Sequence, residues 1–455
     1  MVGYQMIDVR ERVHILSHLP LRFPLVNEYR ALFPAPDTAA MRRWAHMANY
    51  LFPYVKKDQV PLVWEFLGYL YSLDDLIDGD EDGMVADDDH IKEIAKGAIG
   101  IILHGVSEKH FTVSLEGANM EELDVVGDRV HELIMQEIYG LSIEDGNDDS
   151  EAPIPRPGTN HGHILLSRLA KAFEEYFVAC ADANRLAAKG NDITLAEYEQ
   201  IRFREVGQGV LMVFVEILIY GQYRREMETE CECKRSKEPF VFSNQVFADR
   251  LTQELIFKSG NIYGFTNDLV SVERDLKAGQ ATNLVCVLDA QSRRPSRPKQ
   301  KQRSCLDSFR GVKCSVRSPP FTKSIPKPLR RLSTNVSQWH TSFDDSSSTL
   351  IKTSSSEGFP EKGDAKPTPR RSLTISVPAL MRSIDLVNAM ILDYNRTEAL
   401  FLERLAKHYN YTPEQLEFAR KWCAGATCIM VGNFLWSLET DRYKSRTHIF
   451  KELRL

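Results

Sequence analysis

The chain has 455 residues, a formal net charge of −6 and 43% hydrophobic residues, a composition typical of a globular protein rather than a disordered or collagenous one. Its first residues are more charged than the apolar region of a signal peptide, and the sequence shows no run of about eighteen apolar residues that could span a bilayer. The eight cysteines are scattered without the CxxC pairs of a structural zinc site. We therefore expect a soluble, cytoplasmic protein with free thiols.

Helical periodicity dominates the chain, whereas alternating strand patterns are almost missing. Two capping signatures mark helix starts, Thr194 with Glu197, and Thr412 with Pro413 and Gln415. The fold class is therefore predicted to be all-α. The expected helices are 37–52, 60–76, 89–103, 121–139, 163–188, 195–220, 244–277, 378–406 and 412–438.

A first acidic stretch ends the apolar helix expected at 60–76. It carries Asp74, Asp75 and Asp78, of which Asp74 and Asp78 share one helix face. Like charges this close repel one another, and carboxylates at a helix C-terminus also oppose the helix dipole. Local stability does not explain them, and the repulsion needs a cation or solvent to relieve it.

Overlapping residues offer a rival reading as a calcium loop of the EF-hand kind. Asp78, Asp80, Asp82 and Gly83 match positions 1, 3, 5 and 6 of such a loop. The twelfth position, however, is Asp89 and not the longer Glu that gives bidentate ligation. A plain acidic loop over 80–89 is the favoured interpretation, and the calcium sensor stays as the non-enzyme alternative.

A second acidic stretch lies in the helix expected at 244–277. Asn267, Ser271 and Asp275 stand at i, i+4 and i+8, so their side-chain oxygens share one face. Hard oxygen ligands suit magnesium, which binds few carboxylates and completes its shell with water and phosphate oxygens. Together the two stretches indicate diphosphate chemistry.

A basic segment follows. Residues 291–371 hold 18 Lys and Arg against 6 Asp and Glu, in a Ser- and Pro-rich context poor in apolar residues. Such a composition cannot offset chain entropy, so we expect a disordered insertion. No aromatic interleaving supports nucleic-acid binding. Residues 1–290 and 372–455 then form a single helical domain.

These motifs resemble those of class I terpene synthases, specifically the microbial and fungal terpene cyclases. Asp74-Asp75-Leu-Ile-Asp78 is similar to the family's aspartate-rich motif, and the second stretch to its Asn/Ser/Glu triad, with Asp275 where Glu is commoner. The resemblance extends to four further residues. They are Arg202 as a diphosphate-sensing arginine before a helix break, Arg274 as the basic residue of the triad helix, and the C-terminal pair Arg442 and Tyr443. The long spacing from the triad to this pair agrees with an insertion at 291–371.

The resemblance implies a helical bundle around a central cavity and three Mg²⁺ ions as cofactors. Asp74, Asn267, Ser271 and Asp275 would bind magnesium, while Asp75 and Asp78 would mainly orient waters and basic groups. The arginines and Tyr443 would donate to the leaving diphosphate. A dry, aromatic-lined cavity would protect the carbocation, and its candidate wall residues are Phe66, Tyr71, Phe203, Asn433 and Trp436.

The expected function is therefore magnesium-dependent cyclisation of a linear prenyl diphosphate, most simply farnesyl diphosphate to a sesquiterpene. A diterpene cyclase acting on geranylgeranyl diphosphate remains an alternative. A chain-elongating prenyl synthase would carry a second aspartate-rich motif where this chain has Asn267 and Ser271. The expected partner is the small-molecule prenyl diphosphate, with no nucleic acid, no stable membrane insertion, and a monomeric or homodimeric state.

Overall fold

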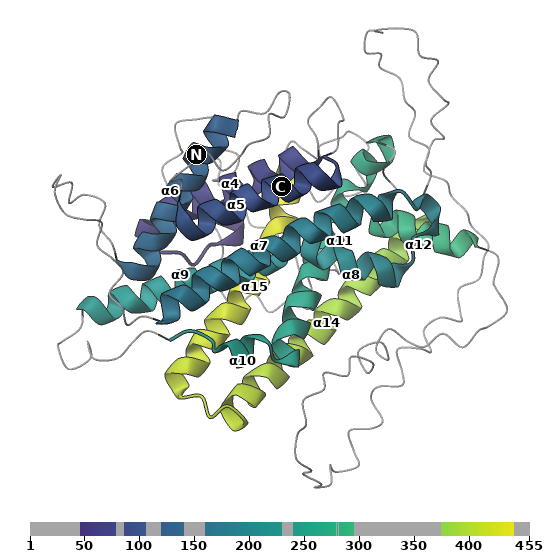
Figure 1. Ribbon diagram of the computed structural model, residues 1–455. Helices are drawn as coiled ribbons and strands as arrows, with labels where there is room; N and C mark the ends of the chain where they lie inside the picture. The colour runs from purple at the N-terminus through teal and green to yellow at the C-terminus, as the bar shows by residue number, and fades with distance from the viewer. Residues whose placement is uncertain are drawn as a thin grey trace, which may run out of the picture.

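The computed structural model describes residues 46–78, 86–105, 120–140, 160–229, 240–278, 280, 282–294 and 375–440 (Figure 1). Every regular element within these ranges is a helix, which confirms the all-α fold class. The expected helix at 37–52 is described only from residue 46, and 46–51 are helical.

The N-terminal helices form one group at one end of the bundle (Figure 1). After the short η2 (Lys57–Gln59) come α4 (Val60–Asp78), α5 (Asp88–His104) and α6 (Met120–Tyr139). Helix α6 packs against both α4 and α5. The predicted helices at 60–76, 89–103 and 121–139 are confirmed to within two residues.

A long helix and a buried one form the middle of the bundle. Helix α7 (Asn160–Ala187) packs against α5, α8 (Leu195–Glu205) and α9 (Gln208–Thr229). Residues 210–222 of α9 are all buried. A helix that is apolar on every side belongs in the interior, and α9 packs against α6, α7, α8, α11 (Arg250–Ala278) and α15 (Pro413–Glu439). The short η3 (Gly190–Asp192) leads into α8.

The single helix expected at 195–220 is wrong in one respect, because α8 and α9 are separate. Helix α8 ends at Glu205, and Gly207 takes φ +68°, a left-handed conformation that glycine adopts without strain. The start of α8 is as predicted, with Thr194 and Glu197 forming a capping box. The break therefore follows the last turn of α8, which carries Arg202.

The remaining helices are grouped around α11 (Arg250–Ala278). They are α10 (Asn244–Phe247), α12 (Leu284–Arg293), α14 (Val377–Lys407) and α15 (Pro413–Glu439). Helix α11 packs against α8, α14 and α15, and α12 packs against α14 (Figure 1). The predicted capping box at Thr412 is confirmed. The expected helix 244–277 is interrupted at Ala248 and Asp249, and α12 was not expected.

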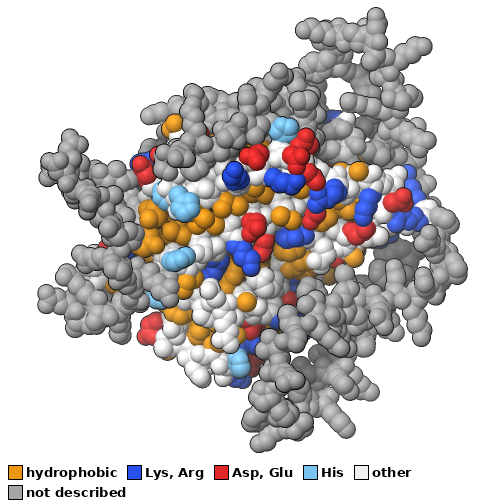
Figure 2. All heavy atoms as spheres, viewed as in Figure 1, with side chains coloured by type: hydrophobic (Ala, Val, Ile, Leu, Met, Phe, Trp, Pro, Cys, Tyr) orange, Lys and Arg blue, Asp and Glu red, His pale blue; other side chains and the backbone are white. Residues whose placement is uncertain are grey.

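Helix α12 runs to Arg293, so the first residues of the expected insertion at 291–371 are helical. The rest of that insertion, from residue 295, lies outside the described residues. Figure 2 shows Lys and Arg side chains interspersed with Asp and Glu on the visible face. Within the described ranges, no helix is both long enough and apolar enough to cross a membrane.

Candidate active site

The second acidic stretch lies in the C-terminal half of α11, and its three predicted ligands lie along one side of the helix. Ser271 and Asp275 are almost fully buried. The Ser271 hydroxyl donates to Asp275 Oδ2 over 2.6 Å. Because that bond uses the hydroxyl proton, the lone pairs of Ser271 Oγ are left to act as acceptors or ligands.

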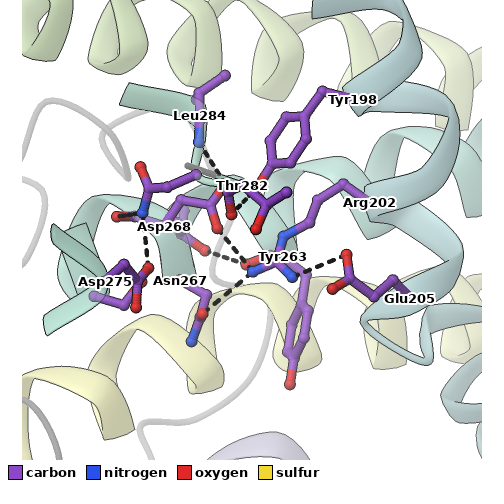
Figure 3. A network of polar contacts seen from close by, with 12 residues as sticks. Tyr198, Arg202, Glu205, Tyr263, Asn267, Asp268, Asp275, Thr282 and Leu284 are labelled. Carbon is purple, nitrogen blue, oxygen red and sulfur yellow. Dashed lines mark hydrogen bonds and ion pairs between the residues drawn. The ribbon is translucent and has the colours of Figure 1, made fainter. Parts of the chain in front are cut away.

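Arg202 reaches this helix from α8 and contacts its polar side chains (Figure 3). Its Nη2 lies 2.7 Å from Asp268 Oδ1 and 3.3 Å from Asn267 Oδ1. On the other side Nη1 lies 3.3 Å from Glu205 Oε2. The guanidinium therefore connects the end of α8 to the start of the α11 face formed by Asn267, Ser271 and Asp275, called here the Asn/Ser/Asp face.

Asp268 is a site residue that the sequence motifs did not single out. It is 1% exposed, and burial raises the pKa of its carboxyl, while Arg202 and Tyr198 oppose that rise. Its Oδ2 accepts from the Tyr198 hydroxyl at 2.6 Å and from the Leu284 N–H at 3.1 Å (Figure 3). These donors make Asp268 the acid that anchors Arg202.

Glu205, at the end of α8, is a second acid that the sequence did not single out. Burial raises the pKa of its carboxyl, Arg202 lowers it, and the negative charges of Asp268 and Asp74 raise it further. The Tyr176 hydroxyl donates to Asp74 and the Tyr176 ring lies near Gly207, so the first acidic stretch faces the helix break. Among the described residues, Asp268 and Glu205 are thus the two acids that contact the Arg202 guanidinium.

The first acidic stretch closes α4. Asp74 is half-buried, and its Oδ1 accepts a 2.8 Å hydrogen bond from the Tyr176 hydroxyl on α7. Asp75 is exposed, and Asp78 is the last residue of α4. Asp80 and Asp82 of the calcium-loop alternative lie outside the described residues, and Asp89 belongs to helix α5.

A pair of tyrosines brings the two stretches side by side. The hydroxyls of Tyr71 on α4 and Tyr263 on α11 are 2.8 Å apart. Tyr71 precedes Asp74 by about one helical turn, and Tyr263 precedes Asn267 by about one turn. The oxygen donors of α4 and α11 therefore lie on neighbouring walls.

Of the other predicted diphosphate donors, Arg274 lies at the site, and the C-terminal pair lies outside the described residues. Arg274 Nε and Nη2 both contact Asp275 Oδ1, at 3.1 and 3.0 Å. Its side chain is 40% exposed, so the guanidinium can leave Asp275 for another anion. Arg442 and Tyr443 lie outside the described residues.

The candidate wall residues take different positions. Phe66 is buried and stacked on Phe214, with ring centroids 3.7 Å apart. Phe203 packs edge-on against Phe257. Asn433 is 1% exposed and its amide lies 3.5 Å from the Tyr263 carbonyl, while Trp436 is 3% exposed. Tyr71, Tyr263 and Asn433 thus adjoin the metal motifs, whereas Phe66 belongs to the aromatic core.

The donor set fits magnesium in its chemistry. Among the described residues, no three acidic, His or Cys side chains gather at one point. The site offers instead a mixed set of carboxylate, amide and hydroxyl oxygens from two helices. Magnesium suits such a set because it keeps waters and takes phosphate oxygens as further ligands.

Residues 155–295 match the family model described as terpene synthase family 2, C-terminal metal binding. This segment runs from the approach to α7 through α12 and contains Arg202, the helix break and the whole Asn/Ser/Asp face. The candidate site therefore lies in the part of the chain that is similar to the metal-binding region of terpene synthases. A comparison with curated protein sequences gives no significant match.

Solved structures of similar overall extent include three terpene synthases. An α-eudesmol synthase shares 14% identity over 95% of this chain and 95% of its own, with a TM-score of 0.47. Germacradien-4-ol synthase from Streptomyces citricolor shares 12% identity over 90% and 89%, with a TM-score of 0.48. Linalool/nerolidol synthase from Streptomyces clavuligerus shares 12% over 94% and 96%, with a TM-score of 0.46. Similarity this low assigns neither substrate nor product to this chain.

Proposed function

We propose that the protein is a magnesium-dependent cyclase that ionises a linear prenyl diphosphate and closes the resulting carbocation into a ring. The observation that carries this proposal is the pairing of two oxygen-donor walls, Asp74 on α4 and Asn267 to Asp275 on α11, through the Tyr71–Tyr263 contact. Arg202 adds a guanidinium at the same place. Two donor walls and a cation are what a diphosphate needs.

Asp74, Asn267, Ser271 and Asp275 are the proposed magnesium ligands. Asp75 is exposed at the end of α4, and with Asp78 it would orient waters and basic groups rather than bind directly. Bound magnesium, three ions in the full site, would offset the negative charge that grows on the diphosphate as the allylic C–O bond breaks.

The arginines complete the proposed leaving-group site. As the C–O bond breaks, its electron pair stays on the diphosphate oxygen, and Arg202, Arg274, Arg442 and Tyr443 would donate to that anion. A double bond of the substrate then attacks the allylic cation. The reaction ends when the ring cation loses a proton, or adds water and then loses a proton, so that diphosphate and a cyclic terpene leave.

The proposed walls exclude water during this sequence. Tyr71 and Asn433 lie next to the metal motifs, Phe203 lies on the α8 side, Phe66 lies deeper in the core, and Trp436 is buried in α15. Aromatic faces stabilise cations without reacting with them. Water in this space would quench the carbocation before ring closure.

We propose farnesyl diphosphate as the substrate and a sesquiterpene as the product. Asn267 and Ser271 favour cyclisation over chain elongation, because an elongating synthase would have acids there. Geranylgeranyl diphosphate is the alternative substrate. We further propose a cytoplasmic enzyme, monomeric or homodimeric, with residues 1–290 and 372–455 as its catalytic domain.

The test is turnover of purified protein with Mg²⁺ and geranyl, farnesyl or geranylgeranyl diphosphate, each followed by gas chromatography and mass spectrometry. The expected result is a cyclic C15 hydrocarbon or alcohol from farnesyl diphosphate, lost on adding EDTA and in Asn267→Ala and Asp74→Ala. Failure of all three substrates to give a cyclic product would refute the proposal. A linear, longer diphosphate as product would assign the protein to chain elongation instead.

A further inference from the structure

Asn283 lies at the junction between α11 and α12 and is fully buried. It is the N-cap of α12, where its side-chain oxygen accepts the Val285 N–H at 2.9 Å. Capping uses only the oxygen of the amide, so its NH₂ group can donate hydrogen bonds elsewhere. In this structure the NH₂ group donates two.

Both protons of the Asn283 amide are donated to α11. Nδ2 lies 2.9 Å from the Asp268 carbonyl oxygen and 2.9 Å from Asp275 Oδ2. One buried side chain thus joins the start of α12, the α11 backbone and the third acid of the Asn/Ser/Asp face. A helix cap alone does not require the last of these contacts.

The Asp275 carboxylate is held differently at its two oxygens. Oδ2 accepts from Asn283 and from the Ser271 hydroxyl, both buried. Oδ1 accepts only contacts from Arg274, whose side chain is 40% exposed, among the hydrogen bonds of the described residues. Oδ2 is therefore anchored by buried donors, and Oδ1 is held by the more exposed Arg274 side chain.

The neutral amide suits this position. A buried Lys or Arg on Oδ2 would cancel the carboxylate charge that attracts a cation. The amide fixes the direction of the carboxylate by one hydrogen bond, is itself held by a second to the Asp268 carbonyl, and leaves the carboxylate charge unchanged. Donors behind a ligating carboxylate or histidine commonly orient it for its metal.

We propose that Asn283 is a positioning residue for magnesium, holding Asp275 so that Oδ1 faces the metal while Arg274 moves from Oδ1 to the diphosphate. This inference rests on the proposed function, because it takes Asp275 as a magnesium ligand. Asn283 itself touches neither metal nor substrate.

The test compares Asn283→Ser and Asn283→Asp with the native protein. Both variants keep an oxygen that can cap α12 but lose the amide donor to Asp275. Thr412→Ala is the matched control, because it removes the N-cap of α15, far from the acidic stretches along the chain. The binding readout is isothermal titration with inorganic diphosphate in excess MgCl₂, and the activity readout is the Mg²⁺ concentration that gives half-maximal turnover.

We expect binding of magnesium diphosphate to weaken about 10- to 100-fold in both Asn283 variants, as for lost donors behind other metal ligands. Half-maximal turnover should need correspondingly more Mg²⁺. Thr412→Ala should lower the Tm and leave both readouts unchanged. An unchanged Mg²⁺ response in folded Asn283 variants would overturn the proposal, and so would failure of both variants to fold, which would make Asn283 purely structural.

The two proposals fail separately. If the native protein binds magnesium diphosphate but converts no prenyl diphosphate, the cyclase proposal is lost while the titration still tests Asn283. If the native protein turns over substrate and the Asn283 variants match it, only the positioning role is lost.

Discussion

Tyr176 on α7 donates a 2.8 Å hydrogen bond to Oδ1 of Asp74 at the end of α4. The tyrosine is 3% exposed, and its ring lies beside Gly207 at the break between α8 and α9. The residue that orients Asp74 therefore lies next to the break between α8 and α9, which follows Arg202 in the chain. Each acidic wall thus has a buried neutral donor from another helix, Tyr176 for Asp74 and Asn283 for Asp275.

Tyr176→Phe should reduce kcat/KM about 10- to 100-fold and raise the Mg²⁺ requirement, because Asp74 loses an orienting donor while the ring keeps its packing. Steady-state kinetics against Mg²⁺ concentration measures both effects. Tyr69→Phe is the control, since the buried Tyr69 hydroxyl makes no hydrogen bond within the described residues. Equal kinetics for the two variants would contradict the role of Tyr176.

Gly260→Ala should destabilise the protein and slow turnover through the contact of α11 with α8. A Cβ at Gly260 would lie 2.7 Å from the Phe203 carbonyl oxygen, so the helices must separate and carry Arg202 away from Asp268. Overpacking of this kind costs about 1–3 kcal/mol. Urea denaturation and kcat/KM measure the two losses.

Gly209→Ala on α9 is the matched control for Gly260→Ala. A Cβ there would meet only Ala172 Cβ, at 4.0 Å. Alanine is the better helix former by about 1 kcal/mol, so this variant should be as stable as the native protein or more so. Equal stability of the two variants would show that α8 and α11 tolerate wider spacing.

Arg202→Met should destabilise the fold as well as abolish turnover. It removes the cation from the buried Asp268 carboxylate, 2.7 Å away, and from Glu205. Loss of one partner of a buried ion pair typically costs about 3–5 kcal/mol. Equilibrium denaturation of Arg202→Met and of Arg202→Met with Asp268→Asn measures this cost, since the second change should restore part of the stability. No recovery in the double variant would show that the charge is not the cause.

The sequence predicted the helices and the faces on which Asp74, Asn267, Ser271 and Asp275 lie, because helical periodicity is local. It did not predict Tyr176, Asp268 or Asn283 as partners of the motifs. Their contacts join helices up to about a hundred residues apart in the chain, and spacing along one helix says nothing about which neighbour packs there. The helical pattern alone did not show the break at Gly207, although the resemblance at Arg202 implied one.

Glu199 on α8 gives a prediction for pH. Burial raises the pKa of its carboxyl from 4.5 to about 7. The folded state therefore binds more protons than the unfolded state between these values, and the free energy of unfolding falls as pH rises through that window. Glu199→Gln does not titrate, so its Tm should rise relative to the native protein between pH 5 and pH 8.

Glu197→Gln is the control for this pH effect. Lys189 and Thr194 lower the pKa of the Glu197 carboxyl to about 2, so that group stays ionised from pH 5 to pH 8. Its variant should differ from the native Tm by the same amount at both pH values. If Glu199→Gln behaves the same way, burial of Glu199 does not control the pH dependence.

The described ends of the expected insertion are joined to each other, which predicts the outcome of deleting it. Asp289 on α12 accepts from both the backbone N–H and the hydroxyl of Ser376, at 3.2 and 2.6 Å, and Ser376 caps α14. This contact joins α12 to the start of α14, near the two described ends of the chain at Arg294 and Ile375. Replacing residues 295–374 by a short Gly/Ser linker should therefore leave the Tm within a few degrees and the product unchanged.

Circular dichroism and product analysis of the deleted protein measure these two quantities. Asp289→Ala should lower the Tm of the deleted protein and of the full chain by similar amounts, because the Asp289–Ser376 contact lies outside the replaced segment. A deleted protein that is folded but inactive would give the insertion a part in catalysis. One that fails to fold would show that the helical domain is not closed at Asp289 and Ser376.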